Sequence, residues 1–436
     1  MDRISEIQSR SISACILIIL ALTACNPSNS GSVVQASTNR QEPTVSQDDL
    51  GELVAGNNIF AFDLYQALKA DEGNLLYSPF SLSEVLSMAY AGARGETAQQ
   101  MAETLNFSLP QDRLHPAFNA LDLRLAKLSD ESGQQGSDED NTEPGFELNI
   151  ANAVWAQKEY PILPEYLEVL ALNYGAGVQL VDFKNDPGDA INRINRWVDK
   201  QTNGRIKQIA DRLDDVGMVL TNAVYFNANW DEPFNEEETE VEPFYLLDGR
   251  PVDASLMHLT DDFAYNEGEG YQAIELPYAN RDFGMVILLP NEGQFQRIEE
   301  QLTSDWVEDV LQGLQTHDVR LTMPKYRFET PLISLKDLLS TMGMSDAFSH
   351  KADFSGIVEQ IPTYLGDVVH KAFIEVNETK TEAAAASAVM IVPVEAPLLT
   401  PPPPIEMRID RPFIFLIRDI QSGAILFVGR VIDPTQ

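Results

Sequence analysis

The order in which helical and strand-like patterns follow one another most constrains the fold of this chain. In the first part, apolar residues recur at the three- and four-residue spacing that is typical of amphipathic helices. These segments are 57–69, 81–91, 97–105 and 116–128. From residue 146 onward, short apolar or alternating runs bounded by turn residues indicate strands. Because helices come first and strands dominate afterwards, the sequence predicts an α+β fold.

The second part also contains helices. Helical spacing returns at 190–202, 298–313 and 335–342. The predicted strands are 146–157, 219–226, 271–277, 284–290 and 319–323. The chain ends in a predicted hairpin, with strands 411–418 and 424–431 joined by a short turn that contains Gly423. An acidic, glycine-rich segment at 129–145 indicates a surface insertion.

The first 24 residues have the pattern of an export signal. Two arginines precede the apolar run 12–22, which is too short to span a bilayer as a stable anchor. The following Leu-Thr-Ala-Cys resembles the lipobox of bacterial lipoproteins, which implies cleavage before Cys25 and acylation of that cysteine. An ordinary signal peptide is the alternative. Residues 25–51 then form a predicted flexible tether before a domain at 52–436, so we expect an exported protein anchored by lipid at the periplasmic or extracellular face of the cell envelope.

Charge and composition exclude several classes of function. The net charge of −37 disfavours nucleic acid and anionic membrane surfaces as partners, so we expect membrane attachment only through the lipid. The second cysteine, Cys15, lies in the signal, so no disulfide is expected. No pair of the five histidines has metal-ligand spacing and no phosphate-binding loop is present, so we expect no metal and no cofactor. Ser345 follows a predicted helix rather than a strand, which argues against a hydrolase nucleophile and against an enzyme.

Several separated motifs resemble those of the serpin family, in the family's order. The N-terminal motif is NLLYSPFSLSEVLSMAYAGARGETAQQM at 74–101. The middle motifs are Asn-x-Trp-Val at 195–198, TNGRI at 202–206, TNAVYF at 221–226, ELPY at 275–278 and MPK at 323–325. The C-terminal motifs are VHKA at 369–372, RPF at 411–413, FVGRV at 427–431 and DPT at 433–435. They cover the chain from about residue 52 to its end.

The resemblance implies one domain of about nine helices and three sheets, with a large central sheet that is one strand short and an exposed reactive-centre loop. It also implies a protease inhibitor that is consumed in the reaction. The target protease cleaves the loop and forms an acyl-enzyme ester, and the loop then inserts into the central sheet and distorts the protease. The implied partner is therefore a protease held in a covalent complex, and we expect a monomer. Insertion is favourable because the new strand gains ladder hydrogen bonds and buried area.

The family's site residues match positions in this chain one by one. The resemblance implies a polar latch, the shutter, beneath the loop and a breach where insertion begins. The shutter residues are Ser78, Ser81, Asn222 and His370, and Trp230 falls in the breach. Glu378 matches the acidic hinge residue that pairs with a lysine, here Lys325; a solvated surface charge is the alternative interpretation. The hinge and loop then occupy 378–410.

The hinge segment 375–388 supports two local interpretations. Its alanines and a Thr-x-x-Glu capping box favour a helix. Small side chains at every position from 383 to 388 would also let it enter a sheet as a strand. The predicted hinge comprises Glu378, Lys380, Thr381, Glu382, Ala383, Ala384, Ala385 and Ala386. Lys380 departs from the family pattern, because inhibitory relatives usually carry glycine there, and this places rapid insertion in doubt.

Alternation predicts which residues the inserted strand would bury. Counted from Thr381, one face carries 381, 383, 385, 387, 389 and 391, none of them charged. The stretch 381–392 also lacks proline, so about 40 Å of strand could enter the ladder. The family's spacing from Glu378 places the scissile bond at Val394-Glu395. Bonds at Leu398-Leu399 and Leu399-Thr400 remain alternatives, although they would draw prolines into the sheet.

The loop sequence indicates the class of target. No basic residue lies between Lys380 and Arg408, so a trypsin-like pocket has nothing to bind. A small apolar residue at the bond favours an elastase-like or subtilisin-like serine protease. The alternatives are a non-inhibitory binding or scaffold protein and an inhibitor of papain-like cysteine proteases, which would share the same hinge.

Overall fold

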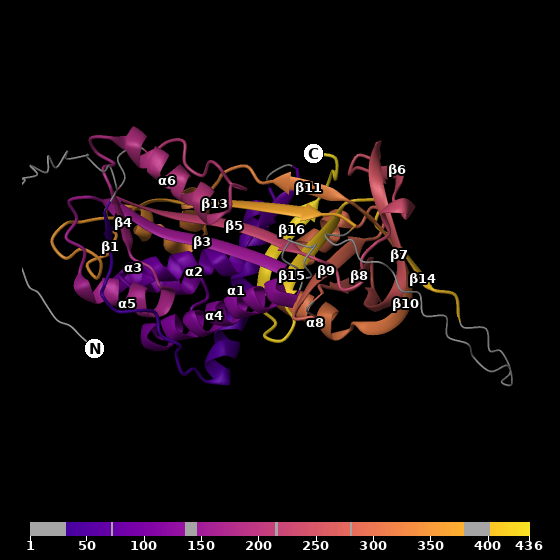
Figure 1. Ribbon diagram of the computed structural model, residues 1–436, viewed down its shortest axis with the longest axis horizontal. Helices are drawn as coiled ribbons and strands as arrows, with labels where there is room; N and C mark the ends of the chain where they lie inside the picture. The colour runs from indigo at the N-terminus through magenta and orange to yellow at the C-terminus, as the bar shows by residue number, and fades with distance from the viewer. Residues whose placement is uncertain (1–31, 71–72, 136–145, 214–216, 280, 379–401) are drawn as a thin grey trace, which may run out of the picture. The chain divides into compact units, whose positions relative to one another are not determined.

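The protein is described from a computed structural model in which residues 32–70, 73–135, 146–213, 217–279, 281–378 and 402–436 are placed. Nine α-helices lie within these residues (Figure 1). They are α1 (Gln47–Leu68), α2 (Pro79–Tyr90), α3 (Gly95–Thr104), α4 (Gln111–Gln135), α5 (Pro164–Tyr174), α6 (Pro187–Gln201), α7 (Phe295–Gln301), α8 (Ser304–Gln312) and α9 (Lys336–Leu339). None of the helices in the described part of the chain is long and apolar enough to cross a membrane.

The strands form two sheets, called sheet A and sheet B here. Sheet A follows the order β1-β4-β3-β5-β13-β11, with β12 also pairing with β13. Its strands are β1 (Val33–Val34), β3 (Phe146–Gln157), β4 (Val178–Val181), β5 (Met218–Ala228), β11 (Tyr326–Glu329), β12 (Ile333–Ser334) and β13 (Leu365–Val376). The central pair, β5 and β13, is parallel and directly hydrogen bonded. Most residues of both strands are buried, including polar ones such as Asn222 and His370.

Sheet A has a hydrophobic core on each face, because successive side chains of a strand point to opposite sides. On β3, Val154 and Ala156 join the larger core with α1, α2 and α4, whereas Ala153 and Trp155 join a smaller one. The smaller core is completed by Ile194 and other apolar residues of α6. Figure 1 shows α6 on one side of sheet A and α2 and α4 on the other.

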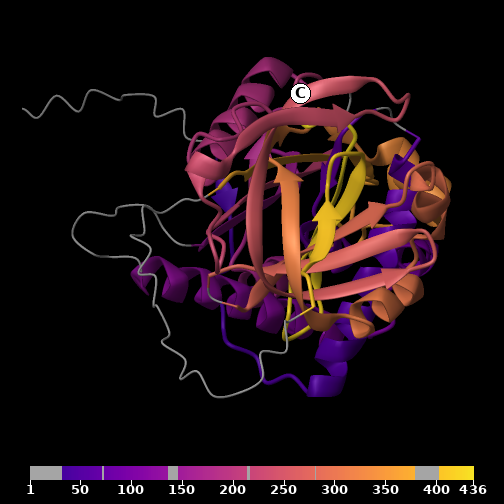
Figure 2. The same ribbon diagram turned by 90° about the vertical axis from the view of Figure 1, so that its right-hand side faces the viewer.

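Sheet B follows the order β14-β10-β7-β8-β9-β15-β16-β2, with β6 also pairing with β7. Its strands are β2 (Leu75–Tyr77), β6 (Glu240–Tyr245), β7 (Pro251–Gly268), β8 (Tyr271–Pro277), β9 (Phe283–Pro290), β10 (Gln315–Pro324), β14 (Ile405–Arg408), β15 (Phe413–Asp419) and β16 (Ile425–Val431). Figure 2 faces this sheet, whose strands from β6 onward are coloured from pink to yellow. The C-terminal hairpin is formed by β15 and β16, which are antiparallel as predicted.

The family resemblance implied three sheets, whereas the described strands form two. The reason is the length of β7, which has 18 residues. Its first part pairs with β6, its middle with β10, and its last residues, from Ala264, with β8. One continuous strand therefore joins what would otherwise be two separate sheets. The sequence patterns did not reveal β7 because its neighbours change along its length.

The predicted tether is wrong from Ser32 onward. β1 pairs with β4, and α1 begins at Gln47, five residues before the predicted domain boundary. Ser46 starts that helix, because its side chain accepts a hydrogen bond from the Asp49 amide. Between these elements the guanidinium of Arg40 bonds the Asn119 side chain of α4. Residues 25–31, with Cys25, and the predicted signal at 1–24 lie outside the described residues.

Three further boundaries need correction. The acidic insertion was predicted from residue 129, yet α4 continues to Gln135; residues 136–145 are outside the described part. The single helix predicted at 298–313 is divided into α7 and α8, because Thr303 caps the second helix by accepting from the Trp306 amide. The predicted loop 378–410 includes β14, which pairs in parallel with β10. The loop therefore ends before residue 405.

Candidate functional site

Four of the predicted site residues meet in the shutter beneath the seam between β5 and β13. Asn222 of β5 and His370 of β13 are register partners across that seam, and both are fully buried. His370 Nδ1 lies 2.5 Å from Asn222 Oδ1, and the Asn222 amide nitrogen donates to the Ser81 hydroxyl. Ser78 caps α2, where its hydroxyl accepts from the Ser81 amide at 3.3 Å. This arrangement forms a polar latch that joins both strands to α2.

The latch histidine is neutral. Burial lowers the pKa of His370 to about 3, although its contact with Asn222 acts in the opposite direction. A neutral imidazole carries one N–H and one acceptor nitrogen. His370 can therefore take both roles in the shutter, with Nε2 facing the Ser78 backbone amide at 3.4 Å.

The breach lies at the end of the same seam. Trp230 follows β5, and its indole N–H donates to the Asn377 carbonyl at 3.0 Å. Its ring stacks on Tyr278 with centroids 4.8 Å apart. The Phe234 amide donates to the Glu378 carbonyl at 3.0 Å. These contacts fix the backbone at the point where β13 ends and the hinge begins.

Glu378 is held by an ion pair rather than by solvent. Only 5% of its side chain is exposed, and its carboxylate lies 2.9 Å from Lys325 Nζ. The Thr239 hydroxyl donates to the same carboxylate at 2.8 Å. Burial opposes ionisation, but the hydrogen bonds from Lys325, the residue's own backbone and Thr239 outweigh it, so the pKa of Glu378 is lowered. The alternative of a solvated surface charge is therefore wrong.

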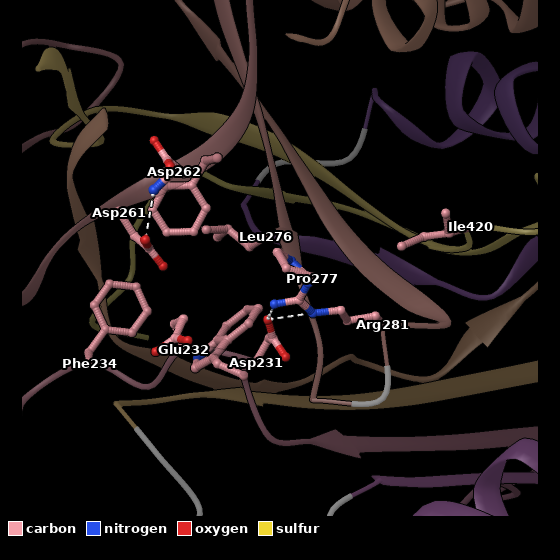
Figure 3. A pocket seen from close by; sticks show the side chains of 11 residues that line it. Asp231, Glu232, Phe234, Asp261, Asp262, Leu276, Pro277, Arg281 and Ile420 are labelled. Carbon is pink, nitrogen blue, oxygen red and sulfur yellow. Dashed lines mark hydrogen bonds and ion pairs between the residues drawn. The ribbon is translucent and has the colours of Figure 1, made fainter. Parts of the chain in front are cut away.

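An acidic cavity of about 470 Å³ opens beside the breach (Figure 3). Its wall includes Trp230 and Phe234, the residues that bond the start of the hinge. Its lining also includes four acidic residues, Asp231, Glu232, Asp261 and Asp262. Arg281 reaches across to Asp231 at 2.6 Å. No group of three or more possible metal ligands is found among the described residues, and these carboxylates do not make one.

The seam itself has the geometry of an insertion slot. β5 and β13 run in the same direction, so a strand placed between them could be antiparallel to both. The chain that leaves β13 must reverse at the hinge to return along it, and it would then run in that antiparallel direction. β13 has 12 residues and β5 has 11, which matches the proline-free stretch 381–392. A segment entering here would displace the contact between Asn222 and His370.

Comparison with known proteins decides the family. The model of the serpin (serine protease inhibitor) family matches residues 55–434. The chain belongs to the serpin family. It is 40% identical over 398 residues to a serpin-like protein of Thermococcus kodakarensis, covering 90% of this chain and 89% of that one. It is 35% identical to Iripin-8 of Ixodes ricinus, covering 89% and 96%. The native structure of the thermophilic serpin tengpin superposes with a TM-score of 0.76 at 27% identity, covering 92% and 97%.

Several predicted site residues of this serpin lie outside the described part of the chain. They are Cys25, the hinge residues from Lys380 to Ala386, and Val394, Glu395, Leu398, Leu399 and Thr400. The placed hinge residue is Glu378, together with its partner Lys325. Ser345 lies between a π-helical turn at 340–344 and a 3-10 turn at 346–348, so it does not follow a strand.

Sequence reasoning missed three polar residues that touch the site. Thr239 bonds Glu378, Asn152 of β3 bonds Asn222, and Glu84 of α2 bonds Asn152. The sequence contained one indication of the role of Asn152. Asparagine is uncommon in strands, and Asn152 interrupts the otherwise apolar run 150–156. Glu84 had a comparable signal, because it is the one charged residue in the segment 79–90, and a carboxylate buried in such a helix needs a partner.

Proposed function

We propose that this serpin is a suicide inhibitor of serine proteases with small apolar specificity, of the elastase or subtilisin kind. The observation that carries the proposal is the seam between parallel β5 and β13, whose length matches the proline-free stretch that directly follows β13. The protease serine would attack the carbonyl carbon of Val394, form an ester and release the new amino terminus at Glu395. Serpins are mostly protease inhibitors rather than enzymes, which supports this assignment.

The decisive experiment mixes the protein with pancreatic elastase and with subtilisin and analyses the products on denaturing gels. We expect a covalent complex that survives SDS, and no complex when the protease serine is first blocked. Mass spectrometry of the released C-terminal peptide would distinguish the bond at Val394-Glu395 from those after Leu398 or Leu399. A parallel reaction with papain tests the cysteine-protease alternative. Complete loop cleavage by all three proteases without any complex would contradict inhibition by insertion.

We further propose that the protein is exported and attached to the cell envelope by a lipid on Cys25. The support is the charged start, the short apolar run and the small residues directly before this cysteine. Expression with labelled palmitate should label the protein, and Cys25→Ala should abolish the label and release the protein from the membrane fraction. Equal labelling of the two forms would refute acylation at Cys25.

A further inference from the structure

A buried carboxyl group stands behind the shutter, on the side away from the seam. Glu84 of α2 is 5% exposed, and its Oε2 accepts a hydrogen bond from the Asn152 side-chain nitrogen at 2.7 Å. Asn152 lies on β3, where it is the register partner of Asn222. The Asn152 side-chain oxygen in turn accepts from the Asn222 nitrogen at 2.5 Å. One residue therefore connects Glu84 to the shutter.

The direction of each hydrogen bond in the series from Glu84 to His370 follows from the bond at Glu84. Glu84 Oε2 accepts from the Asn152 nitrogen, and the Asn152 oxygen is thereby turned to Asn222. Asn222 must then turn its nitrogen to Asn152 and its oxygen to His370. The hydrogen of the neutral imidazole is thereby assigned to Nδ1, which leaves Nε2 to accept from the Ser78 amide.

The groups around Glu84 act on its protonation and hold its backbone, because the Ser87 hydroxyl donates to the Glu84 carbonyl at 2.7 Å. Burial and the charge of Asp122 on α4 raise the pKa of Glu84 well above its usual value, while Arg40 and the bond from Asn152 oppose that rise. Arg40, from the segment before α1, pairs with Asp122 at 2.7 Å. On the neighbouring turn of α2, Ser87 bonds Tyr174, which also bonds His115. In either protonation state one oxygen of Glu84 retains the lone pairs needed to accept from Asn152.

We propose that Glu84 and Asn152 are positioning residues of the shutter: the fixed acceptor at Glu84 orients both asparagines so that Asn222 presents its oxygen to His370 across the seam. The proposal rests on the proposed function, because the contact of Asn222 with His370 is the one that insertion would break. The bond between Asn152 and Asn222 lies between β3 and β5, which insertion does not separate. Glu84 therefore sets the strength of the latch while remaining on the stationary side.

The test compares Glu84→Met, which removes the acceptor, with Glu84→Gln, which retains one. Ser83→Ala is the matched control, because Ser83 is a fully buried neighbour whose hydroxyl has no hydrogen-bond partner among the described residues. The first measurement is the nitrogen NMR spectrum of histidine-labelled protein, with the His370 signals assigned from a His370→Gln sample. We expect Nδ1–H in the wild type, Glu84→Gln and Ser83→Ala, and a loss of that tautomer in Glu84→Met.

The second measurement is the rate at which uncleaved protein converts on warming to a form of higher thermal midpoint. We expect Glu84→Met to convert about five to ten times faster, since one buried hydrogen bond is lost, and Glu84→Gln to restore the wild-type rate. Asn152→Leu breaks the next link and should shift the tautomer in the same way if Glu84→Met does not fold. An unchanged tautomer in both variants, or an equal effect of Ser83→Ala, would overturn the proposal. The NMR result does not depend on inhibition, so a failure of the proposed function would be seen separately.

Discussion

At the scale of single residues, the hinge ion pair is asymmetric. The Glu378 side chain is 5% exposed and that of Lys325 is 47% exposed. Removing Lys325 leaves a buried carboxylate with Thr239 as its one side-chain donor among the described residues, whereas removing Glu378 leaves an ammonium group that water can solvate. The lysine therefore contributes mainly by offsetting the free-energy cost of burying the Glu378 carboxylate. Removing the lysine should destabilise the hinge more than removing the glutamate.

We therefore predict that Lys325→Met destabilises the hinge conformation that contains the ion pair with Glu378 by about 1–2 kcal/mol. This value is smaller than that of a fully buried pair because the lysine is half exposed. Conversion of uncleaved protein to an inserted form should accelerate accordingly. The pKa of Glu378 is lowered in the folded state, so the pair stabilises fully above the usual value of 4.5 and loses this effect as the pH falls below it. The difference between variant and wild type should shrink in that range.

The matched control is Arg327→Met, which removes an exposed cation that lies 3.9 Å from Glu375 near the same hinge. Thermal midpoints and conversion rates, measured from pH 7 down to pH 3, decide the outcome. An equal effect of both substitutions, or a Lys325 effect that does not diminish with acid, would contradict the assigned role.

At the scale of elements, the proposed inserting strand makes a prediction that depends on its face. Ala385 belongs to the face that would be buried, and Ala384 to the opposite one. An arginine at position 385 would enter the core as an unpaired charge at a cost of several kcal/mol, so insertion should be slowed more than tenfold. Ala385→Arg should therefore be cleaved as a substrate and form little complex with elastase.

Ala384→Arg differs by one position and serves as the control for charge and bulk in the loop. The ratio of complex to cleaved protein, read from denaturing gels, should fall sharply for the first variant and much less for the second. Retained inhibition by Ala385→Arg together with loss by Ala384→Arg would show that the face assignment is reversed.

Comparison of elements with the sequence shows where local patterns suffice. The strands 146–157 and 271–277 have their predicted limits, and a glycine precedes each of them in the sequence, Gly145 and Gly270. β7 was missed, since its polar residues 260–262 face different neighbours from those near its ends. The shutter residues were located by family motifs, but the bonds of Asn152 to Glu84 and Asn222 span 68 and 70 residues. Such contacts depend on strand register, which no local pattern records.

At the scale of the whole molecule, sheet A is the element on which each proposal depends. It is buried against a core on each face, and its two central strands are held by the shutter at mid-length and by the breach at one end. A strand added between them would turn one face to the larger core, whereas the smaller core includes only Val219, Ala223 and Val369 of these two strands and so lines only part of the other face. The whole domain would then gain stability from a local cleavage, which is a property that a rigid scaffold protein would lack.

Cleavage of the loop should raise the thermal midpoint of the protein. After cleavage of the loop by subtilisin, the inserted strand would gain ladder hydrogen bonds and buried area, and unfolding would have to remove it from both neighbours. In a chain of this size each 1 kcal/mol shifts the midpoint by about 2 °C, so a net gain of about 5 kcal/mol would raise it by about 10 °C. Calorimetry before and after cleavage measures the change, with cleaved Ala385→Arg as the control that should rise least. A midpoint unchanged by cleavage in the wild type would instead identify a non-inhibitory serpin. Lys380 would then be the first residue to replace by glycine, because inhibitory relatives usually carry glycine there.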